Sequence, residues 1–228
     1  MLSLAVVILL TYLVGSIPTS LIVSKLKGGI DVRKYGSGNA GGTNIIRLFG
    51  WKLGVLVIVL DALKGAFAIL VVAPLMFDTL PFSNMTPFDD LTVVQMIAGV
   101  SAILGHIWSV FASFKGGKGV ATTLGILTGL APVEIAVTVG IFFLVFAISK
   151  YISLGSIVGG ISFPLVMLVR HNIFHAQLTG YGTLIYVSIG LSLLLVYTHR
   201  SNIQRLIAGT EKQLTRIHLN HSHKPAEK

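Results

Sequence analysis

The chain has 228 residues, of which 54% are hydrophobic and only 11% are charged, with a mean hydropathy of +0.86. This composition supplies too little polar surface for a soluble domain, so it predicts an all-α integral membrane protein. The absence of cysteine excludes disulfides, thiolate catalysis and cysteine-ligated metals. The formal net charge of +9 is spread over several loops rather than gathered with aromatic residues, so we do not expect nucleic-acid binding.

Apolar segments in chain order predict seven transmembrane helices. Several approach the ~20 residues that a helix needs to cross ~30 Å of hydrocarbon. Strict alternation of polar and apolar residues is absent, which argues against a barrel. The first segment has no preceding basic residues and no small-residue cleavage site, so we expect it to stay as a helix. The apolar segments are residues 1–24, 53–77, 92–110, 120–131, 133–149, 153–169 and 183–198.

The fourth and fifth helices come from residues 119–149, which are long enough for one comfortable helix or for two short ones. Proline disfavours helix at the residue before it, so we place a break at Ala131-Pro132. A single crossing would put Lys150 and the basic C-terminus outside. Two crossings keep the basic loops on one side, and we expect both helices to be short or tilted.

The distribution of charge predicts an N-terminus outside and a C-terminus in the cytoplasm. The second loop, DTLPFSNMTPFDD, contains three acidic residues and no basic one, whereas the first, third and fifth loops and the C-terminal segment are basic. We expect residues 1–211 to form a single polytopic domain and residues 212–228 to form a polar, disordered tail. The basic residues assigned to the cytoplasmic side are Lys25, Lys27, Arg33, Lys34, Arg47, Lys52, Lys115, Lys118, Lys150, Arg200, Arg205, Lys212 and Arg216.

The first basic loop contains a glycine-rich segment, KYGSGNAGGTNIIR, at residues 34–47. It spells G-x-G-x-x-G, and Asp61 follows twenty residues after the last glycine, but Asp61 lies in an apolar helix and no strand precedes the glycines. A dinucleotide site is therefore not predicted. The glycines, asparagines, hydroxyls and Arg47 instead form a composition that suits a phosphate cradle. An ordinary flexible loop would have the same composition, so both interpretations stay open here.

The third loop ends in KGGKG, residues 115–119, which leads directly into an apolar helix. Two ammonium groups beside backbone amides at a helix N-terminus predict an anion site. This is not a Walker A loop, because Ala112 replaces its first glycine and Gly119 replaces its Ser or Thr, so ATP binding is not supported. Anchoring by positive charge alone requires the lysines but not the three glycines.

The C-terminal segment, YTHRSNIQRLIAGTEKQ at residues 197–213, is polar where the last helix leaves the membrane. His199 and Asn202 are three residues apart and share a helix face, whereas Arg200 and Arg205 are five apart and do not. Contact with anionic lipid would account for the arginines but not for His199, Asn202 or Glu211.

Two further pairs are better explained as structural than as functional. Asp61 and Lys64 are spaced i, i+3 within an apolar run, where buried charges usually pair, so we favour an ion pair over a catalytic role. His171 and His175 are spaced i, i+4, but no carboxylate lies nearby, so we favour interfacial capping over a metal site.

Three segments together resemble a known family. GSGNAGGTNIIR, GHIWSVFASFKGGKGVAT and HRSNIQRLIAGTE are similar to the three cytoplasmic motifs of the bacterial PlsY-type acyl-phosphate:glycerol-3-phosphate acyltransferases. DALKG at residues 61–65 and the spacing between motifs agree, and the resemblance extends from Gly15 to Glu211. This chain departs from the family at Gly42, where alanine is usual, and at Ser109, where proline is usual. Both departures affect loop rigidity rather than the charged positions.

The resemblance implies an enzyme of the bacterial inner membrane with its active site on the cytoplasmic face. It would transfer a fatty acyl group from acyl phosphate to the 1-hydroxyl of sn-glycerol 3-phosphate, releasing lysophosphatidic acid and phosphate. This is the first acylation of phospholipid synthesis, and it would need no cofactor and no metal. The implied partners are these two substrates and membrane lipid, and we favour a monomer.

The resemblance also implies roles for single residues. We expect Arg47 to grip one phosphate, the lysines to neutralise the other or the developing oxyanion, and the glycine amides to complete the cradle. The implied catalytic residues are Ser37, Arg47, Lys115, Lys118, His199 and Asn202; the substrate-binding residues are Gly36, Gly38, Asn39, Thr43, Asn44, His106, Gly116, Gly117, Gly119 and Arg205; the structural residues are Asp61, Lys64 and Glu211.

Three alternatives remain open from the sequence. Ser37 would be an acyl-accepting nucleophile if His199 acted as its base, although no G-x-S-x-G elbow surrounds it. A transporter for phosphorylated solutes would also contain many helices and intramembrane charges, although no inverted repeat is visible. A lipid-anchoring structural protein would explain the basic segments but not the glycine spacing.

Overall fold

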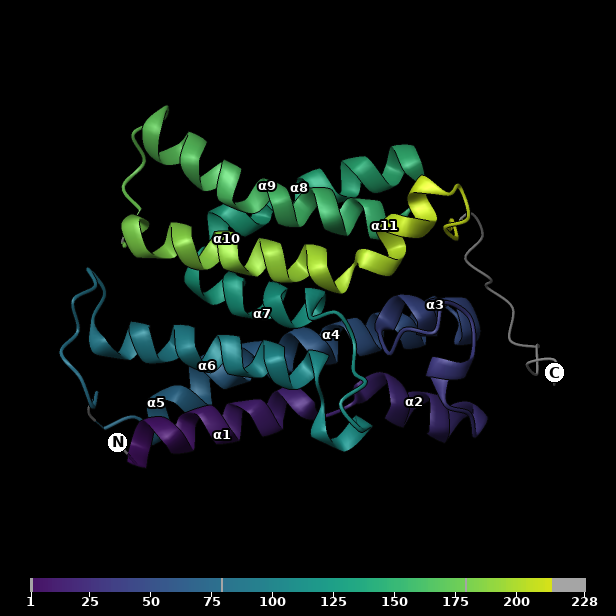
Figure 1. The fold of residues 1–228 in the computed structure, drawn as a ribbon, viewed down its shortest axis with the longest axis horizontal. Coiled ribbons are helices and arrows are strands. Elements are labelled where there is room, and N and C mark those ends of the chain that lie inside the picture. The colour runs from purple at the N-terminus through teal and green to yellow at the C-terminus, as the bar shows by residue number, and fades with distance from the viewer. Residues whose placement is uncertain (1, 79, 179, 215–228) are drawn as a thin grey trace.

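The computed structural model describes residues 2–78, 80–178 and 180–214, and within these ranges the regular structure is entirely helical (Figure 1). The predicted all-helical membrane fold is therefore confirmed. The elements are α1 (Leu2–Ser16), α2 (Thr19–Gly28), η1 (Val32–Lys34), α3 (Gly42–Phe49), α4 (Trp51–Phe67), the π-helix η2 (Ala68–Val72), α5 (Ala73–Met76), α6 (Asp90–Ile107), η3 (Val110–Ala112), α7 (Val120–Leu130), α8 (Pro132–Ser149), α9 (Ile152–Asn172), α10 (Tyr181–Thr198) and α11 (Arg200–Ile207).

Six segments of the described chain are long and apolar enough to cross a membrane by themselves. The predicted break at Ala131-Pro132 is confirmed, since α7 ends at Leu130 and α8 begins at Pro132. With 11 residues, α7 is only ~16 Å long, about half of the ~30 Å hydrocarbon thickness. The six segments are Ser3–Gly28, Trp51–Met76, Asp90–Ala112, Pro132–Ser149, Ile152–Asn172 and Tyr181–Thr198.

The helices pack against one another in pairs: α1 on α6, α4 on α7, α8 on α9 and α10 on α9. The approach of α4 to α7 is especially close because each presents a glycine at the contact. A Cβ on Gly65 would lie 2.3 Å from the Thr122 carbonyl oxygen, and one on Gly125 would lie 1.9 Å from that of Ala62. Small residues allow such backbone contact in membrane proteins. This contact places α7, and the loop before it, firmly against α4.

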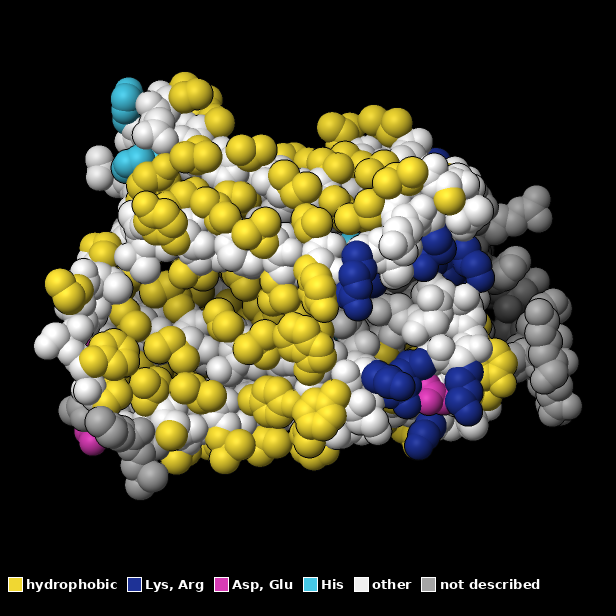
Figure 2. All heavy atoms as spheres, in the orientation of Figure 1, with side chains coloured by type: hydrophobic (Ala, Val, Ile, Leu, Met, Phe, Trp, Pro, Cys, Tyr) yellow, Lys and Arg dark blue, Asp and Glu magenta, His cyan; other side chains and the backbone are white. Residues whose placement is uncertain are grey.

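The helices run side by side, and α2, α3 and α11 gather at one end of the bundle together with the loop before α7 (Figure 1). In Figure 2 the lysine and arginine side chains of the visible face concentrate at this same end, while hydrophobic side chains cover the length of the helices. We call this the basic end. It is where the three polar segments meet.

A polar cluster lies buried among α2, α4 and α6, close to the basic end. The predicted pair is formed, since Lys64 Nζ lies 2.8 Å from Asp61 Oδ1 and both side chains are less than 10% exposed. Thr19 Oγ1 donates to the same carboxylate oxygen at 2.6 Å, and Lys64 also donates to the Ile17 carbonyl at 3.0 Å. His106 Nδ1 lies 3.6 Å from Asp61 Oδ1. The cluster thus ties three helices together below the polar loops.

We expect Gly125→Ala to destabilise the protein. Its methyl group would meet the Ala62 carbonyl oxygen, and overpacking of this kind costs ~1–3 kcal/mol. Thermal unfolding in detergent measures the effect. Gly140→Ala is the matched control, because a Cβ there meets nothing within 4 Å. Equal melting temperatures for the two variants would contradict the close α4–α7 contact.

Candidate functional site

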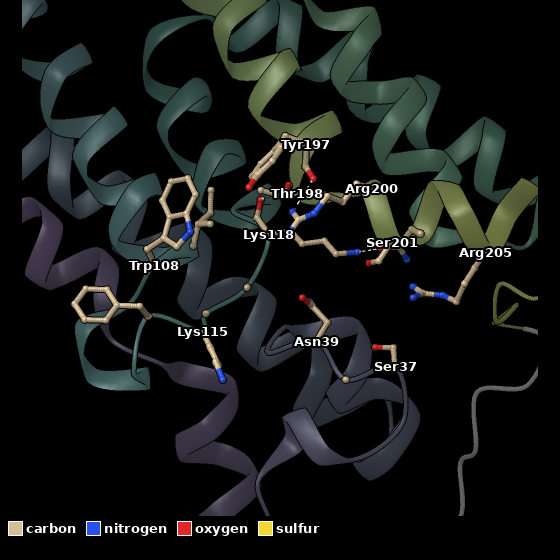
Figure 3. Close-up of a pocket in the computed structure, with 16 residues that line it drawn as sticks. Ser37, Asn39, Trp108, Lys115, Lys118, Tyr197, Thr198, Arg200, Ser201 and Arg205 are labelled. Carbon is tan, nitrogen blue, oxygen red and sulfur yellow. Dashed lines mark hydrogen bonds between the residues drawn. The ribbon is translucent and has the colours of Figure 1, made fainter.

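A cavity of about 280 Å³ opens at the basic end. Its walls come from the loop after η1, from the segment between α6 and α7, and from the end of α10 with α11, which are the three segments singled out in the sequence (Figure 3). The lining residues are Ser37, Gly38, Asn39, Ile107, Trp108, Phe114, Lys115, Gly116, Gly117, Lys118, Tyr197, Thr198, Arg200, Ser201, Asn202 and Arg205.

Asn44 holds the backbone of the glycine-rich loop that forms the first wall of the cavity. Its side chain is fully buried, and Nδ2 donates to the carbonyls of Val32, Tyr35 and Asn39 at 3.0–3.1 Å. Its Oδ1 accepts the Ser37 N–H at 2.9 Å. Asn44 is thus buried within the loop and does not line the cavity, which differs from the substrate-binding role expected from the sequence.

Gly36 and Thr43 do not line the cavity either, although both were expected to bind substrate. Gly36 has φ +64°, and a Cβ there would lie 2.2 Å from Asn44 Oδ1, so this position needs glycine for the loop itself. Ser37, Gly38 and Asn39 are the residues of this loop that reach the cavity. In Figure 3 Ser37 and Asn39 lie across from Arg205.

The backbone amides of the KGGKG loop are used within the chain. Gly116 N–H donates to the Ile107 carbonyl and Gly117 N–H to the His106 carbonyl, each at 3.0 Å. The Gly116 and Gly117 amides are therefore not free to complete an anion cradle, which is the role that the sequence had led us to expect for them. The two glycines are needed for close approach instead, since a Cβ would lie 2.0 Å from the His106 carbonyl oxygen at Gly116 and 2.3 Å from His106 Nε2 at Gly117.

His106 lies beneath this loop and outside the cavity lining. It is buried, with Nδ1 toward Asp61 and Nε2 against Gly117. The structure thus gives His106 a supporting position rather than the substrate contact expected from the sequence. Gly119, also expected to contact substrate, instead takes φ +82° where α7 begins.

The third wall is joined to the second through a chain of side chains that ends on Glu211. Lys118 Nζ donates to Asn202 Oδ1, and Asn202 Nδ2 donates to Glu211 Oε1 at 2.7 Å. Ser153 Oγ donates to the same oxygen at 2.8 Å, and Arg205 Nε donates to Oε2 at 2.6 Å. Glu211 therefore connects the loop before α7, α11 and the start of α9.

Several residues of the site escaped the sequence analysis. Ser153 stands alone at the start of an apolar helix, and no motif distinguished it from other membrane serines. Trp108, Phe114 and Tyr197 form an aromatic part of the cavity lining. Their position in the sequence was the one indication that Trp108 and Phe114 belong to the site, because both lie within the third loop near the lysines.

Burial changes the protonation of two residues at the site. Desolvation lowers the pKa of Lys118 to about 8, although the nearby Glu211 carboxylate acts against this. Desolvation, assisted by the Lys118 charge, lowers the pKa of His199 to about 4. Its Nδ1 lies 2.9 Å from the Leu195 carbonyl oxygen, so the neutral ring carries its proton on Nδ1. At neutral pH His199 is uncharged.

Arg47 lies on α3 and does not line the cavity. Its Nη2 donates to the Lys212 carbonyl at 3.1 Å, and its Nε is buried without a hydrogen-bond partner. Burial lowers the pKa of Arg47, and Glu211 and Arg205 are close enough to act on it with opposite signs. Lys212, which the sequence analysis assigned to the tail, is thus in contact with the body of the protein. Residues 215–228 of the predicted tail lie outside the described residues.

The chain is similar to proteins of one family over nearly its whole length. A family model described as glycerol-3-phosphate acyltransferase matches residues 5–209. A protein named glycerol-3-phosphate acyltransferase from Chlorobaculum tepidum is 42% identical over 94% of this chain and 98% of its own length, and one from Chlorobaculum parvum is 41% identical with the same coverage.

Solved structures agree with this. The crystal structure of PlsY, an integral membrane glycerol 3-phosphate acyltransferase, in its glycerol 3-phosphate form has 35% identity and a TM-score of 0.75, with 93% of this chain and 96% of that chain covered. The lysophosphatidic acid form has 35% identity and a TM-score of 0.74, with 92% and 95% covered.

We expect acidification to destabilise the wild-type protein more than a His199→Gln variant. The pKa of His199 is about 4 in the folded protein and 6.5 as its ordinary value, so between these pH values the unfolded chain binds a proton that the folded chain does not. Stability is then lost as pH falls through this window, by up to ~3 kcal/mol. The free energy of unfolding of each protein, measured in mixed detergent at pH 7 and at pH 4.5, gives this loss of stability. An equal loss in both proteins would contradict the buried, neutral histidine.

Proposed function

This chain belongs to the glycerol-3-phosphate acyltransferase family of integral membrane enzymes, and from that premise we propose the full reaction. The acyl donor is acyl phosphate, the acceptor is the 1-hydroxyl of sn-glycerol 3-phosphate, and the products are lysophosphatidic acid and inorganic phosphate. The reaction is the first acylation of phospholipid synthesis. The enzyme is an acyltransferase, and no cofactor enters this scheme.

The observation that carries the proposal is one cavity that combines several cations with an aromatic rim. Lys115, Lys118, Arg200 and Arg205 all line it, and two substrates that each bear a phosphate need such charges. The aromatic side chains of the lining suit the first part of a fatty chain. The similar PlsY crystal structures are described as glycerol 3-phosphate and lysophosphatidic acid forms, which correspond to the acceptor and the product proposed here.

Direct transfer between the two substrates accounts for the residues present. The glycerol oxygen forms a bond to the carbonyl carbon of the donor, the bond from that carbon to the phosphate oxygen breaks, and the hydroxyl proton leaves with the phosphate. Lys118, held by Asn202, supplies positive charge for the developing oxyanion or the leaving phosphate. Lys115 and Arg205 neutralise the phosphates, and Ser37 orients a substrate. Acyl phosphate is already activated, so positioning and charge stabilisation suffice.

The geometry gives less support to Ser37 as a nucleophile. In the described part of the chain, no hydrogen bond joins Ser37 to His199, and His199 Nδ1 is engaged by the Leu195 carbonyl. His199 is also buried and outside the cavity lining. We therefore give His199 a role in supporting the end of α10 and Lys118 rather than that of a general base.

The topology that fits this function has seven membrane passages, an outside N-terminus and a cytoplasmic active site in the bacterial inner membrane. Lys118, just before α7, donates a hydrogen bond to Asn202. The carbonyl of Lys150, just after α8, accepts the Leu214 N–H at 2.9 Å. The two ends of segment 119–149 therefore both lie near the C-terminal segment, which supports a return passage formed by α7 and α8. The basic residues of this end favour the cytoplasm. We propose residues 1–211 as one domain that acts as a monomer.

The test is the reaction of purified protein in detergent with palmitoyl phosphate and glycerol 3-phosphate. We expect phosphate and lysophosphatidic acid in equal amounts. Lys118→Met should lower kcat by ~10²-fold, the typical effect of losing one oxyanion donor. Lys52→Met is the matched control, because Lys52 is exposed and does not line the cavity.

Two further experiments have outcomes that would contradict the proposal. A stable acyl mass on the Ser37 peptide after incubation with palmitoyl phosphate alone would replace direct transfer with a covalent intermediate. Uptake of glycerol 3-phosphate into proteoliposomes without any new lipid would favour a transporter.

The pH dependence of kcat/KM provides a second prediction. Because the pKa of Lys118 is about 8, its ammonium loses its proton as pH rises through that value, and activity should fall on the alkaline side. Arginine stays charged to pH ~12, so Lys118→Arg should be slower overall but lack this alkaline decline. An identical decline in both enzymes would assign the titration to another group.

A further inference from the structure

We propose that Lys212 is a positioning residue for Arg47, and that through Arg47 it sets the affinity for glycerol 3-phosphate. The inference rests on the proposed function. It adds to that function the role that the sequence analysis expects for Arg47, whose guanidinium would grip a substrate phosphate. It concerns the C-terminal strap, which we define as residues 209–214. The family model ends at residue 209, so Lys212 lies beyond the matched part of the chain.

The strap is fixed at both ends. At its start, the Thr210 and Glu211 N–H groups donate to the Arg205 carbonyl at 2.8 and 3.1 Å, and Gly209 takes φ +68°, which turns the chain back. The Glu211 side chain anchors this end further. At the other end, the Leu214 N–H donates to the Lys150 carbonyl. Lys212 lies between these two anchors, so its position is determined from both sides.

Lys212 makes two contacts that join otherwise separate parts of the site. Its Nζ donates to the Gly36 carbonyl at 2.8 Å, and its own carbonyl accepts from Arg47 Nη2 at 3.1 Å. Gly36 directly precedes Ser37, which lines the cavity. Lys212, on the C-terminal strap, thus connects the glycine-rich loop at Gly36 to Arg47 on α3.

The carbonyl contact has a definite consequence for Arg47. A guanidinium is a planar fork, so one fixed N–H restricts the direction of all the others. Arg47 also lies within electrostatic range of the Glu211 carboxylate, which attracts it, and of Arg205, which repels it. The Lys212 carbonyl gives Arg47 a neutral partner, and within the described residues its other N–H groups make no hydrogen bond that would compete with an anion. Pre-organisation of this kind improves affinity by reducing the cost of ordering on binding.

The experiment compares Lys212→Met, Lys212→Arg and Gln213→Met in the full-length protein. Methionine keeps the length of the side chain but removes the ammonium, and arginine restores a donor to the Gly36 carbonyl. Gln213→Met is the matched control on the same strap, since the Gln213 amide reaches only the Ser149 carbonyl, at 3.5 Å. Calorimetric binding of glycerol 3-phosphate and the kinetic constants for both substrates are the readouts.

We expect Lys212→Met to raise the Kd and the KM for glycerol 3-phosphate by about three- to five-fold, the factor that a hydrogen bond of modest strength supplies. The kcat and the KM for acyl phosphate should stay unchanged, because the lost interaction is equal in ground and transition states. Lys212→Arg and Gln213→Met should resemble the wild type. An unchanged or lower Kd, or an equal effect of Gln213→Met, would overturn the inference.

A double variant separates positioning from direct contact. If Lys212 acts through Arg47, Lys212→Met should add nothing to the loss caused by Arg47→Lys. Additive losses would mean that Lys212 contacts the phosphate itself, which would overturn the proposed role. Binding by calorimetry needs no acyl donor, so failure of palmitoyl phosphate as a donor would count against the proposed reaction and leave this test intact.

Discussion

The Glu211 carboxylate is the interaction on which the site depends. Its side chain is only 4% exposed, and burial alone would raise its pKa, but hydrogen bonds from Ser153, Asn202 and Arg205 hold the pKa below its usual value. A buried charge left without partners is strongly destabilising. Two segments that are distant in the chain, the start of α9 and the C-terminal segment, must therefore meet at this carboxylate, and Asn202 places Lys118 through the same network.

The network can hold Lys118 only because the backbone beneath it is equally constrained. Gly116 and Gly117 pack on His106, whose ring faces the buried Asp61 cluster. The close contact of α4 with α7 fixes the helix that follows the loop. The cations of the cavity are thus carried by rigid elements, and such preorganised charge is more effective in catalysis than mobile charge. This explains how a site at the end of a membrane bundle can act without a metal in the proposed scheme.

Local patterns in the sequence determined much of this protein. The all-helical membrane fold, the break at Ala131-Pro132 and the Asp61–Lys64 pair each follow from composition or from spacing along one helix, and the structure confirms them. The three polar segments were also identifiable, because glycine, lysine and asparagine are unusual between apolar helices. These features depend on residues near one another in the chain, and such residues are what a sequence displays directly.

Only the tertiary structure decided how the polar residues are used. Arg47 meets the Lys212 carbonyl 165 positions away, and Ser153 meets Glu211 58 positions away. The Gly116 and Gly117 amides are used by carbonyls at the end of α6. No local pattern encodes these outcomes, because every buried donor or acceptor takes whichever partner the packing of distant segments brings within reach. The sequence by itself therefore determined which segments form the site, and the packing of those segments decided which atoms face the cavity.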